Sequence, residues 1–309
     1  MYDELKANKR RSILLILGFV VIVFGLGWAF STLIGGGPIG ILIALLIAGG
    51  AAFLSYWKSD AIALAMSHAR PADPREYARL YNLVDGLCIA SGLPKPRLFI
   101  VDDDAPNAFA TGRDQKHAAI AVTTGLLAKL DRLELEAVLA HELGHIKNND
   151  ILVATLAVTM VGAVAILSDL GLRVLWWGGT SHKSDRDKDN AGFGAILAVL
   201  ALVLLVLTPV IAKLMQFAIS RRRETLADVT GVSMTRYPPG LIRALEKLRD
   251  DDTVVHSNSR ATAHLWIESP MPRRDGEVRE RGEGRMLKIN RMFDTHPPIE
   301  DRIAALREL

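Results

Sequence analysis

The chain contains long uncharged stretches separated by polar, charged segments. No charged side chain occurs from Ser12 to Trp57, and the turn signal Gly35-Gly36-Gly37-Pro38 divides this stretch in two. A bilayer core about 30 Å thick is crossed by roughly 20 helical residues. The pattern therefore predicts two membrane spans, near Ile13–Leu33 and Ile39–Trp57. A cleaved signal peptide is the alternative for the first span, but the apolar run is too long for one and a second run follows at once.

Two more uncharged stretches, Ile151–Ser168 and Asn190–Ala212, lie in the second half of the chain. They predict a second pair of spans, and a buried hydrophobic hairpin within a soluble domain is the other interpretation. Basic residues precede the first span and follow the second and fourth, the latter at Lys213 and Arg221–Arg223. Because lysine and arginine at span ends favour the cytoplasmic side, both termini and residues 58–150 are predicted to be cytoplasmic.

The polar segments carry the patterns of a mainly α fold with a small β-sheet. Asp131, followed three residues later by Glu134, predicts the capped start of a helix. The other elements expected from apolar spacing are helices over Pro74–Ala90, around Glu224, over Leu241–Leu248 and after Pro298, and strands at Arg97–Val101 and Ala118–Thr123. The chain then divides into a transmembrane hairpin (1–57), a first cytoplasmic part (58–150), a second hairpin (151–212) and a second cytoplasmic part (213–309).

Composition agrees with an integral membrane protein. Of the 309 residues 50% are hydrophobic and 23% charged, and the mean hydropathy is +0.22, whereas a wholly soluble domain of this size rarely has a positive value. The formal net charge of +3 gives no argument for nucleic-acid binding. Cys88 is the single cysteine, so an internal disulfide and a cysteine-based metal site are excluded.

A candidate metal site lies in the helix that starts at Asp131. His141 and His145 are four residues apart, about 40° around one helix face, so both imidazoles can bind one metal ion, while Glu142 can reach the reacting water. Two ordinary helical histidines are the alternative. A catalytic zinc ion takes a third protein ligand, for which Glu224 is the candidate, although it also fits a solvated helix residue.

Asp228 lies four residues after Glu224 and so on the same helix face. Its carboxylate could accept the remaining N–H of a ligand histidine and fix the ring. A surface carboxylate is the alternative interpretation of this residue.

Five motifs resemble, in the same order, those of the HtpX-type integral-membrane zinc metalloproteases, which are gluzincins related to the CaaX prenyl proteases. The motifs are Asn107–Ala110, Thr123–Leu127, Glu134–His145, Glu224–Asp228 and Thr295–Ile303. The resemblance extends from the N-terminal hairpin to the last helix. It departs from the family at Thr225, where an aromatic residue is usual.

The resemblance implies a role for each matching residue. One zinc ion per chain would be held by His141, His145 and Glu224, with Glu142 as the general base and His296 as a catalytic residue that contacts the substrate carbonyl. Arg302 and Asp228 would support the ligands. An edge strand with Asn107, Ala108 and Phe109 would bind the substrate backbone by adding a strand to the sheet.

The implied function is that of a zinc-dependent endopeptidase in the inner membrane of a prokaryote, with its active site in the cytoplasm. Its partners would be the lipid bilayer and polypeptide substrates, namely misfolded or damaged membrane proteins, as part of protein quality control under stress. Two alternatives stay open: a CaaX-type processing peptidase acting on a lipidated substrate, and a zinc-binding membrane scaffold without proteolysis.

Overall fold

The structure is a computed structural model that describes residues 10, 12–14, 16–18, 20, 21, 24, 28, 37–156, 221–251, 253, 265–267 and 298–309. Its helices are α2 (Gly37–Trp57), α3 (Ser59–Met66), α4 (Ala78–Ser91), the short 3₁₀ helix η1 (Gln115–His117), α5 (Thr124–Lys129), α6 (Arg132–Lys147), α9 (Arg221–Thr235), α10 (Pro238–Arg249) and α12 (Ile299–Leu306). Its strands are β1 (Arg70–Pro71), β2 (Arg97–Val101), β3 (Ala108–Gly112) and β4 (Ala118–Thr123). The prediction of a mainly α fold with a small sheet is confirmed.

The four strands form one mixed sheet in the order β1-β2-β4-β3. Strands β2 and β4 are parallel, and the two outer strands run antiparallel to their neighbours. Strand β4 is buried throughout, because alternate side chains enter different cores: Ile120 and Val122 pack towards α4 and α6, while Ala119 and Ala121 pack on the other face. Strand β3 is left at one edge of the sheet.

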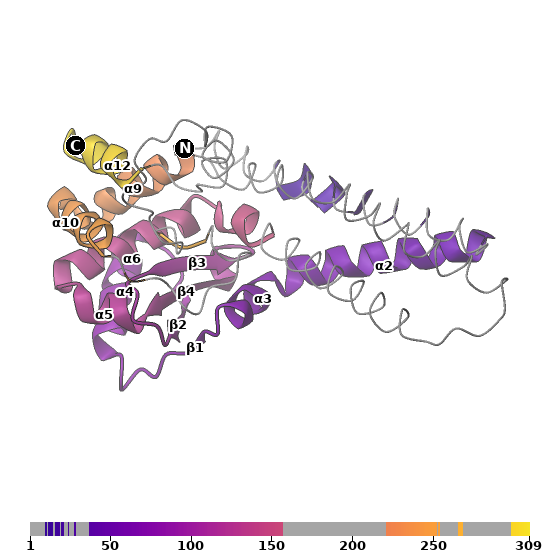
Figure 1. Cartoon of the computed structure of the whole chain (residues 1–309), viewed down its shortest axis with the longest axis horizontal. Coiled ribbons are helices and arrows are strands. Elements are labelled where there is room, and N and C mark those ends of the chain that lie inside the picture. Colours follow the sequence, from indigo (N-terminus) through magenta and orange to yellow (C-terminus); the bar gives the residue numbers. More distant parts are fainter. Residues whose placement is uncertain are drawn as a thin grey trace, which may run out of the picture.

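Helix α6 is the central element of the fold, and it packs against the sheet, α4, α9 and α10 (Figure 1). It starts with the predicted capping box: the Asp131 side chain accepts from the N–H of Glu134, and Glu134 accepts from the N–H of Asp131. Glu134 is buried and also accepts from Lys247 Nζ at 2.7 Å. This ion pair connects the start of α6 to α10.

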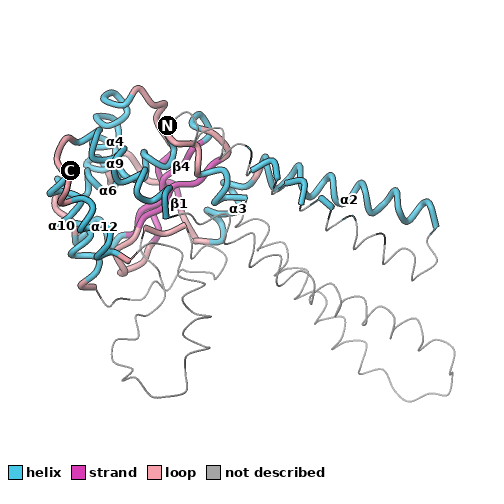
Figure 2. Tube along the Cα trace, turned by 90° about the horizontal axis from the view of Figure 1, so that it is seen from above, coloured by secondary structure: helices cyan, strands magenta, loops and turns pink. Residues whose placement is uncertain are grey.

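Helix α2 extends away from the sheet and the surrounding helices (Figures 1 and 2). It covers the predicted span Ile39–Trp57 and exposes large apolar side chains, among them Ile39 and Leu46. Counting the described positions only, no helix is long and apolar enough to cross a membrane. Most of Ile13–Leu33, all of Asn190–Ala212 and the part of Ile151–Ser168 after residue 156 lie outside the described residues, so the number of spans stays a prediction.

Candidate metal centre

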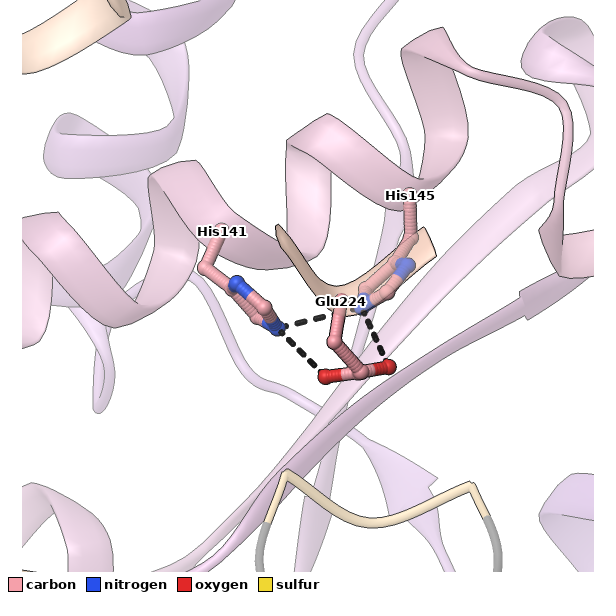
Figure 3. Close-up of side chains that lie close together, drawn as sticks. All are labelled: His141, His145 and Glu224. Atoms are coloured by element: carbon pink, nitrogen blue, oxygen red, sulfur yellow. Dashed lines mark hydrogen bonds and ion pairs between the residues drawn. The ribbon is translucent and has the colours of Figure 1, made fainter. Parts of the chain in front are cut away.

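Two helices bring three metal-ligand side chains together. His141 and His145 lie on α6, and Glu224 lies near the start of α9 (Figure 3). The two Nε2 atoms are 3.0 Å apart, and each lies 3.7 Å from one Glu224 carboxylate oxygen. One ligand atom from each residue falls within 4.8 Å of the others. Among the described residues this is the cluster that the sequence predicted as the metal site.

The close crossing of α6 and α9 depends on two glycines. A Cβ atom on Gly144 would lie 2.9 Å from the carbonyl oxygen of Ala227, and one on Gly231 would lie 2.9 Å from the backbone nitrogen of His141. Real Cβ atoms do not come this close to backbone atoms, so any side chain would push the helices apart. Glycine at these positions therefore lets the α9 carboxylate reach the α6 histidines.

Each histidine faces a buried carboxylate with its other ring nitrogen. His141 Nδ1 lies 2.8 Å from Asp228, and His145 Nδ1 lies 3.0 Å from Asp150. A carboxylate accepts a proton, so in the neutral rings both Nδ1 atoms carry the hydrogen and both Nε2 lone pairs point into the space between the rings. Two lone pairs 3.0 Å apart repel each other unless a cation or a proton lies between them.

The donor set fits a zinc ion. Four tetrahedral ligands at about 2.0–2.1 Å from zinc are about 3.3 Å from one another, and the distances among His141, His145 and Glu224 lie on either side of that value, at 3.0 and 3.7 Å. Two imidazoles and one carboxylate are also the ligands of a catalytic zinc that keeps one position open. The residues present could therefore hold the ion.

Arg302 from α12 connects the ligands to the C-terminal helix. Its guanidinium donates to both carboxylate oxygens of Asp228, at 3.0 and 2.7 Å, and lies 3.7 Å from Glu224. The side chains of Arg302 and Asp228 are almost fully buried. Although burial acts in the other direction, Arg302 and His141 lower the pKa of Asp228 to about 2. Asp228 is thus a permanent carboxylate that orients His141.

The protonation of the two histidines differs. Burial and the nearby Arg302 lower the pKa of His141. Burial also acts against a charge on His145, but the carboxylates of Asp150 and Glu224 outweigh it and raise its pKa to about 10. In the metal-free protein a proton on His145 Nε2 can be shared with His141 Nε2, where a metal ion would otherwise bind.

Glu142 is a buried carboxyl group next to this cluster. It is 1% exposed, and the backbone N–H of Ala110 on β3 donates to it. Burial raises the pKa of Glu142 to about 7, and the negative charge of Glu224 adds to the rise while His145 opposes it. A carboxylate with a pKa near neutrality is suited to accept and return a proton.

Comparison with known proteins agrees with this arrangement. The sequence profile of Peptidase family M48 matches residues 74–309. Proteins named Protease HtpX homolog match over the full chain, with 39% identity in Thermoanaerobacter pseudethanolicus and 43% in Tropheryma whipplei (strain Twist), each over 98% of the relative's length. The relative in Streptococcus gordonii is 37% identical over all of both chains.

The chain belongs to peptidase family M48. Its full-length similarity to the HtpX proteins identifies it as an HtpX-type member, as the motifs indicated. Membership implies a metal-dependent peptidase, typically one that uses zinc. The crystal structure of S. mikatae Ste24p aligns with 97% of this chain over 66% of its own length, with 16% identity and a TM-score of 0.48.

The edge-strand residues that were predicted to bind substrate are covered. Asn107, Ala108 and Phe109 are at most 2% exposed, and the carbonyl of Ala108 accepts from the N–H of Ile267 at 2.9 Å. Trp266 stacks edge-on against Phe109, with ring centroids 4.8 Å apart. In this arrangement a substrate strand could pair at Ala108 only after displacing Ile267. Substrate binding by these three residues stays a prediction.

The remaining predicted site residues fall into two groups. Asp228 and Arg302 lie beside the ligands, as described above, while His296 lies outside the described residues. Asp150, which was not predicted from the sequence, belongs to the metal centre because its side chain contacts His145. The available signal was the sequence Asn149-Asp150 directly after the helix, since asparagine often ends a helix in the left-handed conformation.

Proposed function

We propose that this M48 peptidase is a zinc-dependent membrane endopeptidase that hydrolyses misfolded or damaged membrane proteins at the cytoplasmic face. The single observation that carries the proposal is the position of Glu142. A buried carboxyl group with a pKa of about 7 lies beside two histidines and a glutamate that converge on one point. That combination provides both a metal site and a base.

The chain's own residues supply the proton transfers of peptide hydrolysis. Zinc, held by His141, His145 and Glu224, would supply Lewis acidity to the reacting water and the scissile carbonyl. Glu142 takes a proton from the attacking water and then delivers it to the leaving amine. The Ala110 N–H holds the Glu142 carboxylate against β3 during both transfers. His296 would donate to the carbonyl oxygen as negative charge develops on it.

The edge position of β3 supports a substrate bound in an extended conformation. Among the described strands β3 pairs with β4 alone, and the N–H of Ala110 on β3 donates to Glu142. A polypeptide that displaced Ile267 from Ala108 and lay along this edge would therefore pass the base and the metal ligands. Recognition of backbone rather than side chains suits a protease with many damaged substrates.

The sequence patterns and the family support the membrane part of the proposal. The uncharged stretch from Ser12 to Trp57 is long enough for two crossings, and α2 exposes Leu46 and Phe53 at 66% and 61%, as a lipid-facing helix would. Five residues separate His145 from Ile151, where the third predicted span begins. The metal would then be within about two helical turns of the bilayer.

The test measures zinc content and proteolysis of the full-length protein in detergent, comparing the parent with Glu142→Gln. We expect about one zinc ion per chain in both proteins, and a loss of about 10²–10⁴-fold in hydrolysis of a casein substrate in the variant. Glu136→Gln, on the same helix but partly exposed, is the matched control and should cleave like the parent.

Other outcomes identify the alternatives. Zinc in the parent without cleavage of unmodified proteins, but with cleavage of a prenylated peptide, would support the processing peptidase. Zinc without any hydrolysis across such a panel would support the scaffold. A folded parent that binds no zinc when it is supplied would overturn the proposal.

A further inference from the structure

Asp150 is a buried carboxylate that lies behind a metal ligand and at the start of the next helix. Its side chain is 3% exposed and lies 3.0 Å from His145 Nδ1, on the far side of the ring from the metal position. We propose that Asp150 is a positioning residue that fixes the imidazole of His145 and connects it to the helix beginning at Ile151. This inference rests on the proposed metal site.

The backbone after α6 places Asp150 there by a specific turn. Asn149 has a φ of 54°, in the left-handed region, and its N–H donates to the carbonyl of Ile146 at 3.2 Å. The N–H of Asp150 donates to the carbonyl of His145 at 3.3 Å. These two hydrogen bonds define a Schellman motif, which folds the second residue after the cap back over the third residue from the helix end. Here those two residues are Asp150 and His145.

A Schellman motif usually brings two apolar side chains into contact at this point. In this chain the contact is a hydrogen bond between a carboxylate and an imidazole. Asp150 also accepts, through its backbone carbonyl, from the N–H of Ala154, so it forms part of the first turn of the helix that residues 151–156 begin. One residue therefore holds both the metal ligand and the next helix.

The charges around the two supporting carboxylates are unequal. Asp228, behind His141, shares its charge with Arg302 through two hydrogen bonds. Within the described part of the chain, Asp150 has an ion-pair contact with His145 and with no other residue, and its Oδ1 atom has no hydrogen-bond partner. A buried carboxylate needs a compensating positive charge. A metal ion on His145 would supply it, so the negative charge of Asp150 acts on the metal through a single ring.

The decisive experiment measures metal affinity rather than activity. The metal-free full-length parent and Asp150→Asn are titrated with Zn²⁺ against a competing chelator, and with Co²⁺ by visible absorption. Losing the carboxylate behind a ligand histidine typically weakens metal binding about 10–100-fold. We expect a loss in that range for Zn²⁺ and a changed Co²⁺ spectrum, because His145 is then free to turn.

Asp103→Asn is the matched control. Asp103 is a buried aspartate, 6% exposed, whose side chain accepts from the N–H of Ala105. This variant can lose stability but should keep the Zn²⁺ affinity and Co²⁺ spectrum of the parent. Equal affinity and identical spectra for Asp150→Asn and the parent would overturn the inference.

A backbone variant tests the same idea without removing a functional group. Asn149→Gly keeps the left-handed conformation, while Asn149→Ile strains it and should shift Asp150 away from His145. We expect weaker metal binding in the isoleucine variant and parent-like binding in the glycine variant. A parent that binds no metal would contradict the proposed function; a parent that binds, with both Asn149 variants unchanged, would contradict the role of Asp150 alone.

Discussion

Four carboxyl groups are buried at the metal centre, and the protonation of the site decides how the metal-free protein responds to pH. They belong to Glu142, Asp150, Glu224 and Asp228, and Arg302 forms an ion pair with Asp228. Protons can compensate for a missing metal ion in two places: between His141 and His145, and on Glu142, whose pKa is raised to about 7 by burial.

The raised pKa of Glu142 predicts a pH-dependent stability effect. The folded metal-free protein binds this proton up to about pH 7, whereas the unfolded chain releases it near pH 4.5. The free energy of unfolding therefore falls as the pH rises between these values and stays lower above them. The difference of about 2.5 pKa units corresponds to a loss of at most about 3 kcal/mol in the free energy of unfolding.

Glu142→Gln has no carboxyl group at this position and so avoids the loss of stability that the parent shows as the pH rises. In thermal unfolding of the metal-free protein in detergent, we expect the variant to exceed the parent in Tm at pH 8, and the gap to narrow at pH 5. Glu136→Gln, at a partly exposed position of α6, is the control for replacing a carboxyl group in this helix. A gap for Glu142→Gln that is the same at both pH values would show that Glu142 is not protonated in the folded state at neutral pH.

At the scale of elements, the crossing of α6 and α9 assembles the metal site. Gly144→Ala would place a methyl group 2.9 Å from the Ala227 carbonyl oxygen. This oxygen belongs to the backbone of α9, so it can move away only if the helix moves. We expect a loss of about 1–3 kcal/mol in the free energy of unfolding, together with weaker zinc binding, because Glu224 moves away from the histidines.

Gly86→Ala in α4 is the matched control for that prediction. Apart from the neighbouring backbone of α4 itself, no described atom lies within 4 Å of the added Cβ, so alanine should leave zinc binding unchanged and stabilise the protein by up to about 1 kcal/mol through its higher helix propensity. Thermal unfolding and zinc titration of both variants check the pair. A Gly144→Ala protein with the parent's stability and affinity would show that the close crossing is not required.

The sequence predicted those elements whose signals are local. Strands Arg97–Val101 and Ala118–Thr123 have the predicted bounds, because short apolar runs between turn residues have few other solutions. The capping box at Asp131 could also be predicted from the sequence, since its two partners are three residues apart. The hydrogen bond between Ile267 and Ala108 could not be predicted, because it joins positions far apart in the chain. The contact of Asp150 with His145 depends on a turn conformation that the residue types alone do not specify.

At the scale of the whole molecule, the site joins two separate parts of the chain. His141 and His145 precede the second pair of apolar stretches and Glu224 follows it, yet their ligand atoms are within 4.8 Å. Both parts must therefore lie on the same side of any membrane that the chain crosses. An even number of crossings between residues 150 and 213 satisfies this condition, and an odd number is excluded.

The predicted four-span topology can be tested by cysteine labelling. Cys88 is buried and can be replaced by alanine, after which single cysteines are placed at Arg75 and Glu308, which are exposed, and at Lys183, which lies between the last two apolar stretches. In membrane vesicles, an impermeant maleimide should label Arg75→Cys and Glu308→Cys only when the cytoplasmic face is outside. Lys183→Cys should label only in vesicles of the opposite orientation.

Each departure from this labelling pattern has a defined meaning. Labelling of all three positions from one side would show that the second apolar pair does not cross, in agreement with a buried hairpin and with an intact metal site. Labelling of Arg75→Cys and Glu308→Cys from opposite sides would contradict the metal centre itself, because His141 and Glu224 could not then meet. Zinc content measured on the same single-cysteine proteins separates a disturbed fold from a different topology.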